Sequence, residues 1–287
     1  MADFATGMLT SCLVATALLQ SIVVDGGSGG GLLGAVLPAG GRLAAPMDEL
    51  AGHNVKALVR IAGATLLETA IAACRQTARI GPCVVAGPPE ALAEAVRLGV
   101  DAAIAEADTG PANILLAARR LQEFGAERAL ILATDLPFVT AADVTAFLAS
   151  CPPGAEVAAG LVGRTEMEAL YPGLENRWVR LRSGHVTMTS AFVVDLRRLE
   201  TIRVRLEAAF AARKSQPKMA MLVGIRAIVG LYTGRLTVEF AERRVGRILG
   251  CTVAAVPAAP PALAFDIDTP PDLMYARSYA AQRGRSE

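Results

Sequence analysis

Between Leu33 and Ser150, short apolar runs alternate with longer segments in which apolar residues recur every three or four positions. The runs Leu33–Leu37, Gly81–Ala86 and Arg128–Thr134 predict buried strands, because fully buried parallel strands are apolar on both faces. Strand, helix and strand in this order indicate an α/β fold, with a mostly parallel sheet and helices on both faces. The other elements expected in this half are helices at 66–78, 90–98, 112–124 and 140–150 and a short strand at 102–105.

The second half of the chain has a less regular pattern. Residues 219–236 are apolar apart from Arg226 and Arg235, which favours a core helix or lid over a helix on a membrane surface. The elements expected here are strands at 156–162, 178–182, 189–194, 252–256 and 264–267, helices at 204–212, 219–232 and 237–249, and a helix from Pro270.

The N-terminal residues 8–24 form an apolar, uncharged run that leads into the glycine-rich stretch 25–31. A signal peptide needs basic residues before such a run, whereas only Asp3 precedes this one. The run is also at the lower limit for a membrane span, about 17 residues. We expect residues 1–31 to be an extension with a flexible linker, outside the fold or packed on it as an extra helix. Membrane targeting is the less favoured alternative, and a cytoplasmic protein is expected.

The composition excludes several classes of function. Hydrophobic residues make up 53% and charged residues 19% of the chain, which excludes a disordered protein. The net charge is +1, and Lys and Arg form no run of the kind that binds nucleic acid. Five cysteines without a CxxC pair argue against a structural zinc site, and two histidines are too few for a histidine metal cluster.

Gly40 and Gly41 directly follow the first expected strand. Glycines at this point let the backbone approach a phosphate chain with its amide groups as donors, and Arg42 adds a positive charge. Taken alone, the glycine pair is better explained as an ordinary tight turn. Lys56 precedes the next apolar segment and becomes a candidate ligand only if this turn binds phosphate.

Three aspartates are candidates for a metal site. Asp135 follows a central strand, so its carboxylate is expected at the edge of the sheet where ligands bind. Asp266 and Asp268 are two residues apart on an extended run, which puts both side chains on one face. Mg²⁺ takes one or two carboxylates together with phosphate oxygens. A turn or helix cap is the alternative for Asp135, and Asp272 fits the first turn of the last helix.

The order of these segments resembles the sugar-nucleotide and MobA-like nucleotidyltransferases. The resemblance extends over residues 33–276, which makes it more specific than any single motif. The matching segments are Leu37–Arg42 (LPAGGR) for the glycine turn, Lys56 for the lysine, Leu66–Glu68 after it, Gly110–Asn113 (GPAN) for the nucleoside contact, Thr134–Phe138 (TDLPF) for the metal motif and Asp266–Leu273 (DIDTPPDL) for the late aspartate element.

The resemblance implies a three-layer, Rossmann-like fold of the GT-A type. It implies a Mg²⁺-dependent enzyme that transfers a nucleoside monophosphate from an NTP to a small anionic or hydroxyl acceptor and releases pyrophosphate. The domain would span 32–276, with 155–250 as an acceptor-side or lid insertion and 277–287 as a polar tail.

The resemblance also implies roles for individual residues. Lys56, Arg42 and Asp135 would be catalytic, and Asp135 with Asp268, or less favourably Asp266, would hold the metal. Acceptor candidates are Thr189 and Ser190. Lys214 and Lys218 are further candidates because the basic segment 213–218 could close over an anionic acceptor, although a solvated helix end explains this segment equally well. The residues implied to bind the nucleotide are Pro38, Ala39, Gly40, Gly41, Arg42, Lys56, Ala86, Gly87, Gly110, Asn113 and Thr134.

The chain departs from the family pattern around the glycine turn. Pro38 lies inside the turn, and a looser stretch at 43–55 replaces the expected G-x-R-M before Lys56. A catalytically degenerate nucleotide-binding module is therefore one rival interpretation. A membrane-associated enzyme that uses a lipid-linked phosphate is another, and it rests on residues 8–24 and 219–236. A molybdenum-cofactor-type guanylyltransferase is a further alternative, and the sequence leaves the base, the acceptor and the oligomeric state open.

Overall fold

The computed structural model describes residues 31–199 and 224–284 of the chain. Several sequence predictions lie outside these residues: nearly all of the N-terminal extension, the helix at 204–212 and the basic segment with Lys214 and Lys218. The described part contains no helix that is long and apolar enough to cross a membrane.

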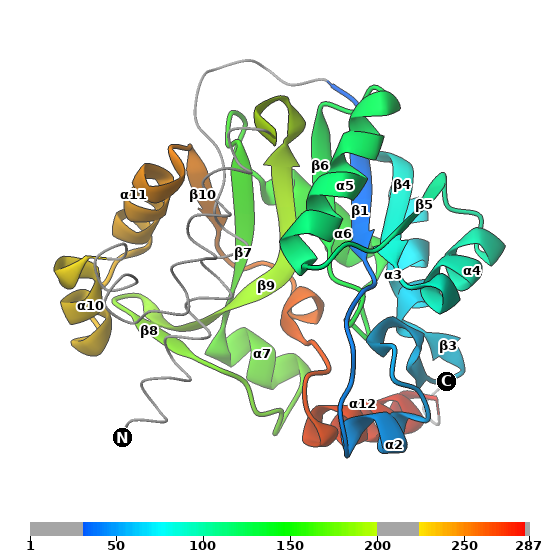
Figure 1. Ribbon diagram of the computed structural model, residues 1–287. Helices are drawn as coiled ribbons and strands as arrows, with labels where there is room; N and C mark the ends of the chain where they lie inside the picture. The colour runs from blue at the N-terminus through cyan, green and yellow to red at the C-terminus, as the bar shows by residue number, and fades with distance from the viewer. Residues whose placement is uncertain (1–30, 200–223, 285–287) are drawn as a thin grey trace.

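Eight strands form one mixed, mostly parallel sheet in the order β10-β7-β9-β6-β1-β4-β5, with β8 paired to β9 (Figure 1). β1 is parallel to both β4 and β6, and β9 is the one strand of the described sheet that runs in the opposite direction to the others. The predicted α/β fold is confirmed. The strands are β1 Leu33–Pro38, β4 Ile80–Gly87, β5 Ala102–Ala105, β6 Arg128–Leu132, β7 Val157–Gly163, β8 Val179–Leu181, β9 Gly184–Asp195 and β10 Val253–Val256, with β2 Arg60–Ile61 and β3 Ala64–Thr65 as a separate hairpin.

Helices cover both faces of this sheet (Figure 1). Side chains of α5 and α11 pack on one face, and those of α3, α6, α7 and α12 pack on the other. In β1, Ala35 and Leu37 face the second set and Val36 faces the first, and all three are buried. Burial on both faces explains why the strands are continuous apolar runs. The helices are α2 Met47–Ala51, α3 Leu66–Arg75, α4 Pro89–Arg97, α5 Gly110–Glu123, α6 Ala141–Ser150, α7 Arg164–Leu170, α10 Ile225–Tyr232, α11 Val238–Leu249 and α12 Pro270–Arg283.

Side-chain caps fix where two helices begin. Thr140 caps α6 in a capping box with Asp143, as its position before the helix predicts. Thr269 and Asp272 form the same arrangement at the start of α12, which confirms the structural role expected for Asp272. Helix α12 continues to Arg283, into the residues expected to form a tail.

The prediction of a strand at 264–267 is wrong. Pro261–Ala264 form a 3₁₀ turn, and the residues after it pair with no strand of the described chain. Their backbone contact is with the loop after β6, because the Ile267 amide donates to the Asp135 carbonyl over 3.1 Å. The short helices α2 and α7 were not predicted.

Candidate active site

The loop after β1 crosses the carboxyl edge of the sheet. The Ala39 amide donates to the Ala86 carbonyl over 2.7 Å, which joins this loop to the end of β4. A methyl group on Gly87 would lie 3.1 Å from the Ala39 side chain, which is tighter than an ordinary contact, so a glycine at this position favours the close approach of this loop to β4. The amide groups of Gly40 and Gly41 donate to no group in the described part of the chain. They remain available as donors to a bound anion.

Arg42 is held against this loop by an acidic partner. Its guanidinium pairs with both carboxylate oxygens of Glu106, and its Nη1 also donates to the Gly40 carbonyl over 2.9 Å. Glu106 was not among the predicted site residues. The signal was present, because Glu106 directly follows the strand β5, which ends at the same edge as β1 and β4.

Two predicted residues support the loops with buried polar groups. The side-chain oxygen Oδ1 of Asn113 accepts from the Ala107 amide over 2.5 Å, and its Nδ2 would lie 3.0 Å from a methyl group on Gly40. The Thr134 hydroxyl donates to the Pro38 carbonyl over 2.8 Å. Both side chains are buried. Thr134 anchors the loop after β1, which contains Gly40 and Gly41 and is called the glycine loop below, and Asn113 anchors the loop after β5 next to Gly40. Gly110 is exposed at the first position of α5.

Lys56 is brought beside the glycine loop by a closed side loop. Arg42 and Val55 form a β-bridge, and the Lys56 amide donates to the Gly41 carbonyl over 3.0 Å. The irregular stretch 43–55 therefore loops out and returns, instead of extending the turn. Lys56 reaches the position next to Gly41 despite the missing motif residues.

The ammonium group of Lys56 lies among the three predicted aspartates. Its Nζ lies 2.6 Å from Asp135 Oδ2 and 2.6 Å from Asp268 Oδ1. One carboxylate oxygen from each of Asp135, Asp266 and Asp268 lies within 4.8 Å of the others. Ile267 is fully buried between the last two, so both carboxylates face the site, as their spacing predicts. We call these four residues the Lys56 cluster.

The clustering changes the ionisation of its members. Burial raises the pKa of Asp266 to about 7, and the charges of Asp135 and Asp268 add to the effect. Burial alone would raise the pKa of Asp268 too, but the charge and hydrogen bond of Lys56, with smaller contributions from Arg177 and Asp266, together outweigh it, and the pKa falls below its ordinary value. Burial opposes the Lys56 charge, yet Asp135 and Asp268 raise its pKa above the ordinary value and keep it protonated.

The donor set fits a divalent cation. One lysine faces three carboxylates, which leaves an excess of negative charge. Asp135 Oδ1 is buried and has no hydrogen-bond partner in the described chain. A buried acceptor without a partner is costly, and carboxylate oxygens are the ligands that hard divalent cations prefer.

A cavity of about 560 Å³ opens beside Asp266 and Asp268. Thr189 and Ser190 line it, but the Thr189 hydroxyl is already used, because it donates to the Ala191 carbonyl and accepts from the Gly160 amide. Ala191 is buried in the core and contributes nothing to this cavity.

Comparison with known proteins identifies the family. The model of the MobA-like NTP transferase domain matches residues 35–222. The chain belongs to this family. It is a nucleotidyltransferase with the Rossmann-like fold expected from its sequence, while the roles of its individual residues remain predictions. No curated protein sequence gives a significant match.

Solved structures related to this MobA-like transferase share its fold. A hypothetical transferase from Thermus thermophilus is 26% identical, with a TM-score of 0.73, and the match covers 84% of this chain and 99% of that one. A CMP:2-keto-3-deoxy-manno-octonic acid synthetase complexed with CTP is 17% identical over 88% and 99% of the two chains, with a TM-score of 0.56. A nucleotidyl transferase from Methanothermobacter is 18% identical over 88% and 100%, with a TM-score of 0.53.

Proposed function

We propose that this MobA-like transferase moves a nucleoside monophosphate from an NTP to a phosphate or hydroxyl acceptor, with Mg²⁺, and releases pyrophosphate. The observation that carries the proposal is the Lys56 cluster, which lies at the same edge of the sheet as the unpaired amide groups of Gly40 and Gly41. Nucleotidyl transfer needs hydrogen-bond donors that bind the phosphate groups and a carboxylate site that binds the metal.

The nucleotide is assigned to the edge formed by β1, β4 and β5. The amide groups of Gly40 and Gly41 donate to the triphosphate, and the Arg42 guanidinium supplies charge from its position beside Glu106. Ala86, Gly87 and Asn113 form the adjoining surface for the base. The buried hydrogen bonds of Asn113 and Thr134 keep this surface in place before the nucleotide arrives.

Catalysis in this proposal is positioning and charge neutralisation. Asp135, Asp266 and Asp268 would hold Mg²⁺, which supplies positive charge at the phosphate oxygens. Lys56 stays protonated between two carboxylates and contributes a second positive charge. An acceptor oxygen forms the new bond to the α-phosphorus, the bond to the β-phosphate oxygen breaks, and pyrophosphate leaves. No protein nucleophile is required.

Pyrophosphate release tests the proposal. ATP, GTP, CTP and UTP are each incubated with Mg²⁺ and a panel of phosphate acceptors, with wild type and Asp135→Asn side by side. We expect release from one preferred NTP, lost in the variant. A thermal-shift screen of the four NTPs supports the choice, because a ligand at 100 times its Kd stabilises by about 2.7 kcal/mol. Release at the wild-type rate by Asp135→Asn would refute the role of the cluster.

A further inference from the structure

The cavity beside Asp266 and Asp268 is large enough for an acceptor with a bulky group. Its volume of about 560 Å³ is in the range of pockets that enclose whole small ligands. Strands β7 and β9 form one wall, and the segment from α10 to α11 forms a second one together with β10. Residues of 174–181 and 264–272, which include several polar side chains, close the cavity toward the Lys56 cluster. The Arg182 amide donates to the Leu236 carbonyl over 2.9 Å, which ties the second wall to the β8–β9 hairpin.

The side chains from these walls are mainly apolar. Leu161, Met188 and Phe192 come from the strands, and Leu231 and Leu236 come from the helical segment. Glu242 also lines the cavity, but its carboxylate already accepts from the Ala255 amide over 2.8 Å. Covering apolar surface with another apolar group gains about 25 cal/mol per Å². A sugar phosphate does not match this surface, whereas a hydrocarbon chain does.

The outer face of α10 is also apolar. Ile225, Val229 and Tyr232 are 72%, 52% and 69% exposed, and their spacing of four and three residues puts them on one stripe. Ala227 is buried on the other side, and Leu231 of the same helix lines the cavity. Helix α10 therefore has one apolar side that is exposed and another side that faces the apolar cavity.

The segment that carries this stripe has an excess of positive charge. Residues 224–249 contain five arginines and only two glutamates, and one of these, Glu242, is engaged with the Ala255 amide. A short helix with an apolar face and surrounding arginines is suited to the surface of an anionic membrane. Helix α10 has eight residues, which is too short to cross a bilayer.

Arg177 gives the cavity a cationic group near the metal-binding residues. It lines the same cavity as Asp268, and its charge is one of those that lower the pKa of that aspartate, after the dominant effect of Lys56. It is the only Lys or Arg among the described residues that line the cavity. A phosphate beside Arg177 would lie next to the Lys56 cluster.

We propose that the acceptor is a phosphate monoester of a lipid, taken from an anionic lipid surface against which the outer face of α10 rests. The hydrocarbon chain occupies the cavity, and the phosphate lies between Arg177 and Asp268. This inference rests on the proposed function. An oxygen of the lipid phosphate bonds to the α-phosphorus, the bond to the β-phosphate oxygen breaks, and pyrophosphate leaves with the electron pair. The product is a nucleoside diphosphate lipid, and a dianionic acceptor needs no proton transfer.

The test measures pyrophosphate release with the preferred NTP and three acceptors. These are ethyl phosphate, decyl phosphate free in solution, and farnesyl phosphate in vesicles of phosphatidylcholine with or without phosphatidylglycerol. Each buried methylene contributes about 0.8 kcal/mol, so we expect kcat/KM for decyl phosphate to exceed that for ethyl phosphate at least about a hundredfold. Phosphatidylglycerol should raise the rate with farnesyl phosphate about tenfold or more.

Two variants test the role of the cavity and the role of the outer face of α10 separately. Leu231→Gln places an amide in the cavity wall and should lower kcat/KM for decyl and farnesyl phosphate about tenfold or more. Val229→Gln, on the outer stripe, should lower the rate with vesicle-borne farnesyl phosphate and leave decyl phosphate unchanged. Leu116→Gln, an exposed leucine on α5, is the matched control and should change neither. All three variants should retain the thermal shift with the NTP.

The outcomes are distinguishable. Equal kcat/KM for ethyl and decyl phosphate, or NTP stabilisation without turnover of any of the acceptors, overturns the lipid assignment and leaves nucleotide binding intact. A full vesicle rate in Val229→Gln overturns the docking of α10. Absence of both NTP stabilisation and pyrophosphate release refutes the proposed function itself.

Discussion

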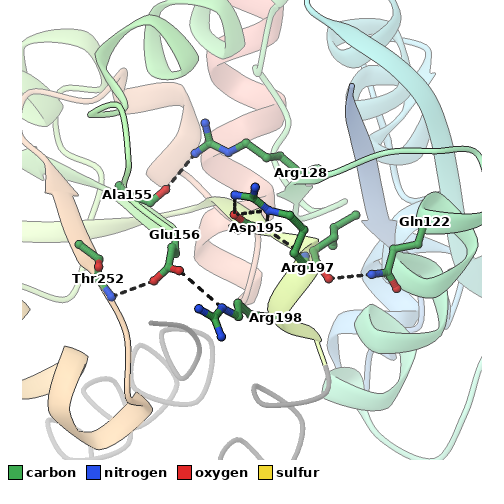
Figure 2. A network of polar contacts seen from close by, with 9 residues as sticks. Gln122, Arg128, Ala155, Glu156, Asp195, Arg197, Arg198 and Thr252 are labelled. Atoms are coloured by element: carbon green, nitrogen blue, oxygen red, sulfur yellow. Dashed lines mark hydrogen bonds and ion pairs between the residues drawn. The ribbon is translucent and has the colours of Figure 1, made fainter. Parts of the chain in front are cut away.

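Two groups of carboxylates, a buried one and a partly exposed one, lie at opposite edges of the same sheet and differ in how their charges are balanced. At the edge where β6 begins, Figure 2 shows Asp195 beside Arg197 and Glu156 beside Arg198. Asp195 Oδ1 accepts from the backbone amide and from Nε of Arg197, both over 2.9 Å. Glu156 accepts from the Thr252 amide over 3.3 Å and lies 3.9 Å from the Arg198 guanidinium. Each acid has a basic partner.

At the edge where β6 ends, Lys56 is shared by Asp135 and Asp268, and Asp266 lies beside them. The effect on ionisation is opposite at the two edges. Burial tends to raise the pKa of Asp195, but its bonds from Arg197 lower it below the ordinary value, whereas the pKa of Asp266 rises to about 7. A paired acid is typical of a structural ion pair, whereas an acid with a raised pKa in a cluster with excess negative charge is typical of a ligand-binding site.

Asp135→Asn should have the largest effect, on catalysis. We expect kcat/KM to fall about a thousandfold, roughly 4 kcal/mol, because a metal-binding charge is lost. The free energy of unfolding should change by less than about 1 kcal/mol, since Asp268 still pairs with Lys56 and the repulsion with Asp266 decreases. Steady-state kinetics and urea unfolding measure both. A variant that is unstable but retains its kcat would reverse the comparison.

Asp195→Ala should have the next largest effect, on stability. Loss of the charged hydrogen bonds to Arg197 should lower the free energy of unfolding by about 2 kcal/mol. The cost is limited because the Arg197 side chain is 59% exposed and can return to water. The kcat of the folded variant should equal that of wild type. A tenfold lower kcat at full folding would show that this edge also serves catalysis.

Gly40→Ala should have a smaller effect, on nucleotide binding. The new methyl group would lie 2.7 Å from Glu106 Oε2 and 3.0 Å from Asn113 Nδ2, so one of these groups must move. We expect the KM for the NTP to rise about tenfold, about 1.4 kcal/mol, with little change in stability. An unchanged KM would argue that the triphosphate does not bind this loop.

The pH dependence of stability should show the smallest effect. Because the folded pKa of Asp195 is lowered, its contribution is present above the unfolded pKa of about 3.9 and is lost as the pH falls through the folded value. The stability difference between wild type and Asp195→Asn should therefore shrink as the pH falls from 6 to 3. Urea unfolding across this range measures it, and a difference that grows would contradict the assignment.

The sequence predicted those features that depend on local pattern. The strand Ala102–Ala105 matches its predicted bounds, and Thr140 caps α6 as expected. The shared face of Asp266 and Asp268 was also predicted, even though the strand was wrong. An extended backbone is enough to alternate side chains, and it does not require a pairing partner.

The contacts within the site depend on tertiary structure and were not predictable from local pattern. Lys56 and Asp135 are 79 residues apart, and Arg42 and Glu106 are 64 apart. No local sequence pattern predicts that the stretch 43–55 folds back and brings Lys56 next to Gly41. The cavity next to Asp268 likewise arises only where β9 meets α10 and α11.

Calorimetric titration of each NTP into wild type and Asp135→Asn, with Mg²⁺ and with EDTA, addresses the Lys56 cluster itself. We predict that one NTP binds wild type with Mg²⁺, and that EDTA or the variant weakens binding at least about tenfold. Equal affinity under all of these conditions would contradict a metal-dependent nucleotide site at this edge of the sheet.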